Sequence, residues 1–462
     1  MMKKYLTLLL LIPLAIACTP KNDGVAITGL IENLDKDNFV MGGPGGSRDS
    51  VFLDEGGNFV YEDTDIDEGG LHYMIFGNDV LYLWLAPGME MDFYADMSDL
   101  KRTMGFTGDG SDINNYQASK NIRAFNYEWF ELDEEEFRYK ADSLLAEQQG
   151  KLNTAQKLDP DNPYWKMEEA DILFSWANNL ATYPSAHPYY ADIEDYNLPE
   201  GWYDYRDQLS IDNPEYIESR AFESYIGTLV REAVSERSSG ILAEDSTAVI
   251  DRNLMNLEIA SNLISNEEVL SHYLTSTITG ALQWTDLSEL DDAIEFYKSR
   301  VTNEEYLAKF NEEYDAWSKL SEGQPMHEFT GRDLDGNQVS SVDFRGKYLY
   351  VDVWATWCGP CIHEIPFLKE LEADYHDRNI VFLSYSIDED KDAWLKFVPE
   401  NELGGVQIIG EDAWESQLCK DYKIKGVPTF MFFDPEGKII SVKMTRPSDQ
   451  KTRDTFDSYS DL

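Results

Sequence analysis

Cysteine and basic side chains are both scarce in this chain. Its 462 residues include only four cysteines, Cys18, Cys358, Cys361 and Cys419. Secreted folds that depend on disulfides carry more cysteines in a much shorter chain, so that class is excluded. Only 38 Lys and Arg stand against 87 Asp and Glu, which gives a formal net charge of -49. Such an acidic chain repels polyanions, which excludes nucleic acid and anionic membrane surfaces as partners.

The apolar run at the amino terminus is too short to cross a bilayer as a permanent helix. It extends from Tyr5 to Ile16 after Lys3 and Lys4, and this order is typical of a secretory signal. The small residues before Cys18 resemble a bacterial lipobox, although Ala15 stands where leucine is more usual. The resemblance implies cleavage before Cys18 and lipidation of its thiol, with residues 1–17 as the signal peptide. The alternative is an ordinary signal peptide that contains a cysteine.

Composition predicts three further regions. Residues 18–110 contain short alternating runs between Asp/Gly turns, which predict a small β domain. The turn Asp54–Asn58 is expected to close a hairpin. Residues 111–322 have little glycine and place apolar side chains at helical spacing, which predicts an all-helical linker domain. Residues 323–462 alternate strands with helices, which predicts an α/β domain. The three regions together predict a multidomain fold: a small β domain, an all-helical middle region and a C-terminal α/β domain.

The positions of proline and histidine give two further predictions. Pro184 and Pro188 are among the prolines that we expect at helix boundaries, because proline interrupts the backbone hydrogen bonds of a helix. His72, His187 and His272 are scattered singly, so the sequence predicts no metal site built from them.

One Cys-x-x-Cys pair carries the chemistry. The apolar run Lys347–Ala355 predicts a central strand, and the amphipathic stretch Ile362–Tyr375 predicts a helix. Cys358 and Cys361 lie between them, which places Cys358 at a helix N-terminus, where free N–H groups and the helix dipole stabilise a thiolate. We expect Cys358 to attack a substrate disulfide and Cys361 to resolve the mixed disulfide. Zinc knuckles also use such pairs, but no second pair is present to complete four ligands.

The surrounding residues resemble a known family. Val351–Cys361 resembles thioredoxin, and Ile362–Phe367 resembles the TlpA/ResA-like branch. Pro325–Val339 with Phe344–Lys347 is similar to the β-hairpin that precedes the motif strand in that family. The resemblance implies a thioredoxin fold, thiol–disulfide oxidoreductase activity without a cofactor, and a redox disulfide between Cys358 and Cys361. Upstream, the β region resembles the uncharacterised β domain that precedes thioredoxin domains in many bacterial lipoproteins.

The resemblance also implies a substrate groove. Lys425–Phe430 resembles the family's cis-proline loop, which lays the Val427 backbone beside the Cys358 sulfur, while Pro428 withholds a competing donor. There the loop can pair with an extended substrate peptide. The residues implied in substrate binding are Trp357, Gly359, Pro360, Val427 and Pro428.

Two acids accompany the dithiol. Thioredoxins keep a buried aspartate beneath the second cysteine, and Asp352 occupies that position. Burial would raise its pKa and let it move protons to and from Cys361. Glu364 stands where the TlpA/ResA branch carries its own acid, and the two are expected to titrate as a coupled pair. A solvated helix face is the alternative for Glu364. Cys419 is expected to be buried and inert.

These residues predict an extracytoplasmic reductase of disulfides in exported proteins. The Gly-Pro pair matches reductants near about -270 mV rather than oxidants near about -120 mV. The expected partners are disulfide-containing exported proteins and a membrane electron donor. The expected place is the periplasmic side of the outer membrane, through a lipid on Cys18. The alternatives are a thiol peroxidase of the same fold, and a partner-binding lipoprotein in which the thioredoxin domain is accessory. The end of the chain after Ser448 is expected to be frayed or shortened.

Overall fold

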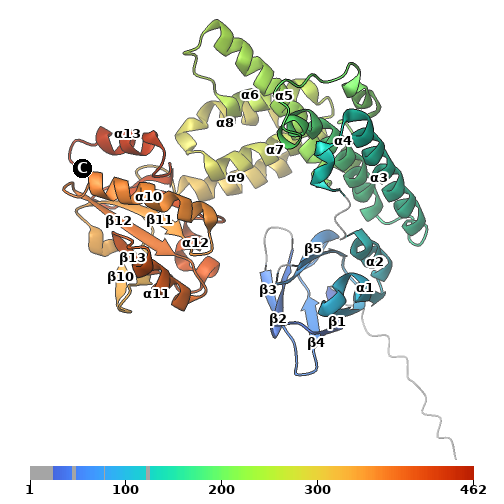
Figure 1. Cartoon of the computed structure of the whole chain (residues 1–462), viewed down its shortest axis with the longest axis horizontal. Coiled ribbons are helices and arrows are strands. Elements are labelled where there is room, and N and C mark those ends of the chain that lie inside the picture. The colour runs from blue at the N-terminus through green and yellow to red at the C-terminus, as the bar shows by residue number, and fades with distance from the viewer. Residues whose placement is uncertain (1–23, 44–47, 78, 121–124) are drawn as a thin grey trace, which may run out of the picture. The chain divides into compact units, whose positions relative to one another are not determined.

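The computed structural model describes residues 24–43, 48–77, 79–120 and 125–462 (Figure 1). The predicted signal peptide and Cys18 lie outside these residues. The chain forms two compact units, one up to Thr228 and the other from Leu229 onward. The boundary falls inside helix α5, Arg220–Glu244. The boundaries expected at residues 110 and 322 stay predictions.

Two four-stranded sheets form the β region of the first unit. Their strand orders are β4-β1-β7-β8 and β3-β2-β5-β6. Burial alternates along the strands, so that in β4 Phe59 and Tyr61 face inward while Asn58 and Glu62 face outward. The strands span β1 Val25–Glu32, β2 Asn38–Gly42, β3 Arg48–Phe52, β4 Asn58–Asp63, β5 Gly70–Phe76, β6 Asp79–Leu85, β7 Glu90–Asp96 and β8 Gly105–Gly108.

The turn Asp54–Asn58 does not close a hairpin within one sheet. Asp54 Oδ1 accepts hydrogen bonds from the backbone N–H groups of Gly56 and Asn58, both at 2.8 Å, so the turn itself is tight. However, β3 pairs with β2 and β4 pairs with β1. The sequence identified the turn correctly but not its strand partners, because local turn chemistry does not specify the long-range pairing of the strands that follow.

The helices of the first unit pack partly against these sheets. Pro184 and Pro188 lie inside α4 rather than at a helix boundary, so that prediction is wrong. Tyr183 and His187 next to them are buried, and this packing outweighs the hydrogen bonds that two prolines remove near a helix end. The helices are α1 Leu100–Thr103, α2 Ser111–Lys120, α3 Glu134–Ala155 and α4 Tyr164–Tyr190.

A buried carboxylate joins α2 to α4. Glu168 of α4 is fully buried. It accepts hydrogen bonds from the hydroxyls of Tyr116 at 2.9 Å and Tyr164 at 2.8 Å, and it forms an ion pair with Lys120. The partners that a buried carboxylate needs are therefore supplied by α2 and by the first turn of α4 itself.

The second unit begins with helices. Asp251, Asn266 and Asn303 cap three of them through side-chain oxygens that accept from the first free N–H groups. Beyond α5, these helices are α6 Arg252–Leu263, α7 Glu267–Trp284, α8 Asp291–Arg300 and α9 Glu304–Ser318. Among the described residues, no helix combines the length and apolarity that crossing a membrane requires.

A seven-stranded sheet follows, with the order β10-β9-β13-β12-β11-β14-β15. The central strand β11 pairs in parallel with β12 and antiparallel with β14. All residues of β11 except Asp352 are buried, as the apolar sequence predicts. The strands span β9 Thr330–Arg332, β10 Gln338–Ser340, β11 Tyr348–Trp354, β12 Ile380–Ser386, β13 Val406–Ile409, β14 Thr429–Phe433 and β15 Ile439–Met444.

Helices α10 and α13 share one core with the sheet. Leu368 and Leu371 of α10 and Phe456 of α13 belong to the same buried cluster as Tyr350. The expectation of a frayed end is wrong, because Phe456, Tyr459 and Leu462 are enough to pack it. The helices of this part are α10 Gly359–Asp374, α11 Lys391–Glu400, α12 Gln417–Asp421 and α13 Gln450–Ser458. The predicted class, a β domain, a helical middle and a thioredoxin-like α/β domain, is confirmed.

Candidate active site

The dithiol lies where β11 turns into α10. Cys358 is the N-cap of α10, and Gly359 and Pro360 are its first residues, so proline stands where no backbone donor is needed. Cys358 and Cys361 form a disulfide with an S–S distance of 2.03 Å. The N–H of Cys361 points at the Cys358 sulfur over 3.2 Å. The same donor would stabilise a thiolate at Cys358 once the bond is reduced.

A second segment contacts the reacting sulfur. The Val427–Pro428 peptide bond is cis, as the sequence predicts. The Val427 carbonyl oxygen lies 3.6 Å from Cys358 Sγ. Cys358 itself is only 4 % exposed, whereas Trp357 beside it is 58 % exposed, with its ring centroid 6.2 Å from that of Trp414. The Cys358 sulfur is therefore flanked by the Val427 backbone and by an exposed tryptophan.

Asp388, which the sequence analysis did not single out, holds the turn before Cys358. Its buried carboxylate accepts from the Thr356 backbone N–H at 3.0 Å and from the Thr356 hydroxyl at 2.7 Å. The Ser386 hydroxyl donates to it as well, at 2.7 Å. The feature of the sequence that points to Asp388 is its position just after the strand β12. Because β12 pairs in parallel with β11, the carboxyl ends of both strands lie at the same edge of the sheet.

Asp352 lies in the middle of β11, deep in the sheet but with partial solvent access. Burial raises the pKa of Asp352 to about 7, a hydrogen bond from Ser384 opposes that shift, and the negative charges of Glu364 and Glu372 add to it. Both of those acids belong to α10, so Asp352 faces the helix that carries Cys361. A group with this pKa can hold or release a proton near neutral pH.

Glu364 is buried, which does not fit the solvated helix face considered as its alternative. Its oxygens accept from the Ser448 backbone N–H at 3.0 Å and the Ser448 hydroxyl at 2.9 Å. Arg446 Nη1 lies 3.9 Å away. These contacts tie α10 to the segment that enters α13. The coupling to Asp352 is present as a charge effect on the pKa of Asp352.

Cys419 is buried in α12 and unpaired, and burial raises the pKa of its thiol. A thiol in that state reacts poorly, as expected. Within the described part of the chain, no group of three His, Cys, Asp or Glu side chains is placed to hold a metal ion.

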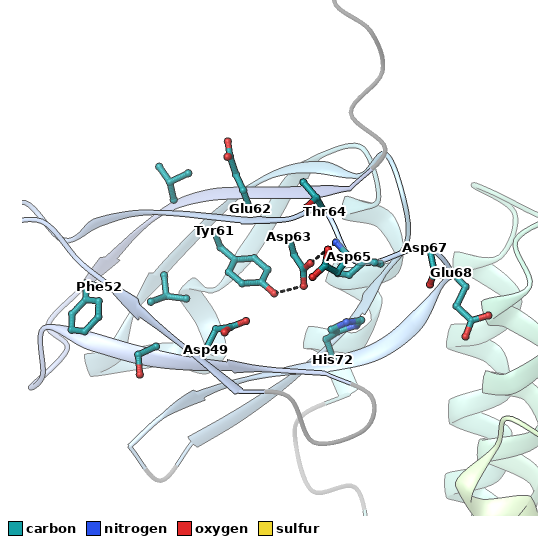
Figure 2. A pocket seen from close by; sticks show the side chains of 14 residues that line it. Asp49, Phe52, Tyr61, Glu62, Asp63, Thr64, Asp65, Asp67, Glu68 and His72 are labelled. Atoms are coloured by element: carbon teal, nitrogen blue, oxygen red, sulfur yellow. Dashed lines mark hydrogen bonds between the residues drawn. The ribbon is translucent and has the colours of Figure 1, made fainter. Parts of the chain in front are cut away.

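A separate cavity opens in the β region between β3, β4 and β5, with a volume of about 890 Å³ (Figure 2). Its wall carries several carboxylates, and the Tyr61 hydroxyl donates to Asp63 over 3.0 Å. His72 is buried there, its ring Nδ1–H donates to the Gly70 carbonyl oxygen over 3.0 Å, and burial lowers its pKa. Its lining contains no cysteine, so it adds nothing to thiol chemistry.

The part of the chain that contains the Cys358–Cys361 disulfide is similar to known proteins. The Redoxin family model matches residues 321–459. Thiol-disulfide oxidoreductase ResA of Bacillus thuringiensis is 30% identical over 122 residues, which cover 26% of this chain and 69% of that protein.

Two solved structures from Bacteroides vulgatus, both described as candidate thiol-disulfide oxidoreductases, are also similar. One is a crystal structure with 35% sequence identity and a TM-score of 0.29. The match covers 30% of this chain and 98% of the chain in that structure. The other is a solution structure with 45% sequence identity and a TM-score of 0.27. The match covers 29% of this chain and 89% of the chain in that structure. Through its C-terminal region, this chain belongs to the ResA-like family of thioredoxin-fold thiol–disulfide oxidoreductases.

Proposed function

We propose that this protein reduces disulfides of exported proteins outside the cytoplasm. Reduced Cys358 attacks one sulfur of a substrate disulfide, forming a mixed disulfide and releasing the first substrate thiol. Cys361 then attacks Cys358 Sγ, which releases the second substrate thiol and leaves the Cys358–Cys361 disulfide. Two electrons and two protons pass to the substrate. The single observation that carries this proposal is Cys358 Sγ at the N-terminus of α10, 3.6 Å from the Val427 carbonyl.

Asp352 supports the second step of this cycle. Cys361 must lose a proton before it attacks, and a carboxylate with a pKa of about 7 accepts that proton at neutral pH. In this proposal Glu364 adjusts Asp352 through its charge rather than touching the sulfurs. Trp357, Gly359, Pro360, Val427 and Pro428 form the surface that receives the substrate.

The proposed direction of electron flow follows from the residues between the cysteines. Cys-Gly-Pro-Cys is the thioredoxin sequence, and thioredoxin is a reductant near about -270 mV. A membrane donor of thiols then has to restore the dithiol after each turnover. No cofactor takes part in the exchange itself.

The proposed location is the cell envelope, on the periplasmic face and anchored by lipid at Cys18. The motivating feature is the small-residue sequence that precedes this cysteine. Labelling with a radioactive fatty acid should modify the full chain and spare Cys18→Ser. Equal labelling of both would contradict the lipid anchor.

A trapping experiment tests the chemistry. Cys361→Ala should accumulate mixed disulfides through Cys358 in cells, whereas Cys358→Ala should accumulate none. Equilibration of the purified protein with glutathione should give a potential near about -270 mV, and a value above about -180 mV would instead indicate an isomerase. Peroxide consumption that survives Cys361→Ser would favour a peroxidase.

A further inference from the structure

A cavity of about 430 Å³ opens beside the cis-proline loop, inside the second compact unit. Pro428 forms part of its wall, and the preceding Val427 carbonyl touches the Cys358 sulfur. The opposite wall comes from the helices, with Trp284 at the end of α7 and Trp317 in α9. The cavity thus begins one residue from the contact with the reacting sulfur and is shared between the helices and the α/β domain.

The charge of this cavity is opposite to that of the chain. Four cations, Lys423, Lys425, Lys443 and Arg446, line it together with one carboxylate, Asp449. The chain as a whole carries -49. Charges interact over a Debye length of about 8 Å at physiological ionic strength, so a ligand inside the cavity responds mainly to these neighbours.

Two of the cations hold the helices against the sheet. Lys443 Nζ donates to the Thr285 carbonyl at 2.8 Å, at the C-terminus of α7, and lies 4.1 Å from the centroid of the Trp317 ring. Lys423 forms an ion pair with Glu313 of α9 at 2.9 Å. Their charges are used within the fold, and they fix the end of α7 next to the cavity.

Lys425 and Trp284 have no such structural use. Lys425 is exposed, and it has no hydrogen-bond or ion-pair partner among the residues that the structure describes. Arg446 contacts Glu364 at 3.9 Å, yet its side chain is more than half exposed and reaches the cavity. Trp284 is 75 % exposed although it sits at a fixed helix end. Tryptophan and arginine are side chains that protein interfaces favour, and the exposed Lys425 adds a positive charge beside them.

We propose that this cavity binds the stretch of substrate polypeptide next to the reacting cysteine and selects stretches that carry Asp or Glu. The inference rests on the proposed reductase function. A substrate paired with the Val427 backbone continues along the loop toward Lys425, two residues before Val427, which chain connectivity keeps within about 10 Å. One carboxylate there meets Lys425 or Arg446, and an apolar side chain packs on Trp284. The helical region thereby becomes part of the specificity surface.

Matched disulfide peptides test the proposal with the full-length reduced protein. The peptides differ only in flanking residues, which are Glu in one and Gln in the other. We expect kcat/KM to be about 10-fold higher for the Glu peptide at low salt, and this ratio to shrink as salt rises. Lys425→Glu should bring the ratio to one or below. Trp284→Ala should lower kcat/KM several-fold for both peptides.

Lys438→Glu is the matched control, because Lys438 is also exposed but lies outside the cavity lining. It changes the net charge by the same amount and should leave the Glu/Gln ratio as it was. Equal rates for the two peptides, an equal effect of both lysine variants, or no effect of Trp284→Ala would each overturn the proposal. A protein that also fails to reduce oxidised glutathione and Ellman's reagent would fail as a reductase altogether, which is a different result.

Discussion

Glu168 in the helices of the first unit and Asp352 in the sheet of the second are both withdrawn from solvent, yet their surroundings differ. Glu168 is fully buried and receives two tyrosine hydroxyls and one lysine. Asp352 has one hydrogen-bond partner that stabilises its charge, Ser384, and two acids nearby that oppose it. The first carboxylate is neutralised by its partners. The ionised form of the second, Asp352, is unfavourable in the folded state.

This difference separates a carboxylate that holds a fold together from one suited to proton transfer. A buried charge with a full set of partners is costly to remove, because its partners are then left unpaired. A buried carboxylate that lacks partners loses stability when ionised, and its pKa moves toward neutrality. Its retention in a core strand beside a dithiol is consistent with a function that offsets that cost.

Replacing Glu168 should give the largest loss of stability. Glu168→Ala leaves two buried tyrosine hydroxyls and Lys120 without their acceptor, which costs about 3–5 kcal/mol of unfolding free energy. Hydrogen exchange of the amides in α2 and α4 measures the loss. Thiol exchange at Cys358 should be unaffected, because the site belongs to the other unit. Glu169→Ala removes the exposed neighbouring acid and should cost little, and an equally large effect there would contradict the assignment.

Asp352→Asn should act in the opposite direction on stability. The folded pKa of about 7 exceeds the unfolded value of about 3.9. The folded state therefore holds a proton that the unfolded chain loses, and stability falls as pH rises from about 4 to about 7. Asparagine does not ionise, so the Asp352→Asn variant does not lose stability in this way as the pH rises. The variant should match the wild type near pH 4 and exceed it by roughly 2–4 kcal/mol at pH 8 in urea unfolding.

The same variant should slow disulfide reduction at neutral pH by about 10- to 100-fold, since a proton acceptor is lost. Glu372 supplies the control, because burial also raises its pKa to about 7, but it lies about three turns along α10 from Cys361. Glu372→Gln should gain stability at pH 8 without losing activity. If both variants slow the reaction alike, Asp352 has no special part in it.

The sequence predicted the dithiol and its loop because neighbours in the chain determine them. Cys358, Cys361 and Pro428 each belong to a short motif with a fixed local geometry. Asp388 was missed because its partner Thr356 lies 32 residues away and meets it only through the pairing of β11 with β12. The interior position of Pro184 and Pro188 was missed for a related reason, since tertiary packing overrode a local rule. The cationic cavity likewise combines residues from distant segments.

Asp388→Asn should show the effect of loosening the turn before Cys358. The amide keeps one acceptor oxygen in place of two charged ones, so the bonds to Thr356 and Ser386 weaken by about 2 kcal/mol in total. Asp388 positions the turn and does not touch the sulfurs, so we expect KM to rise more than kcat falls and the ultraviolet thiolate titration of Cys358 to shift. Asp390→Asn, at the exposed cap of α11, should change none of these readouts.

Glu364→Gln should have the smallest effect, because Glu364 resembles Glu168 in being paired, while its charge also acts on Asp352. Glutamine can still accept one bond from Ser448, so the unfolding free energy should fall by only about 1 kcal/mol. Since the charge of Glu364 raises the pKa of Asp352, its removal should move the midpoint of the pH–rate profile to lower pH. Glu370→Gln removes an exposed acid of the same helix and should leave that midpoint in place. A loss of activity as large as that of Asp352→Asn would instead make Glu364 a direct participant in proton transfer, and the two acids would then have to be treated as one coupled pair.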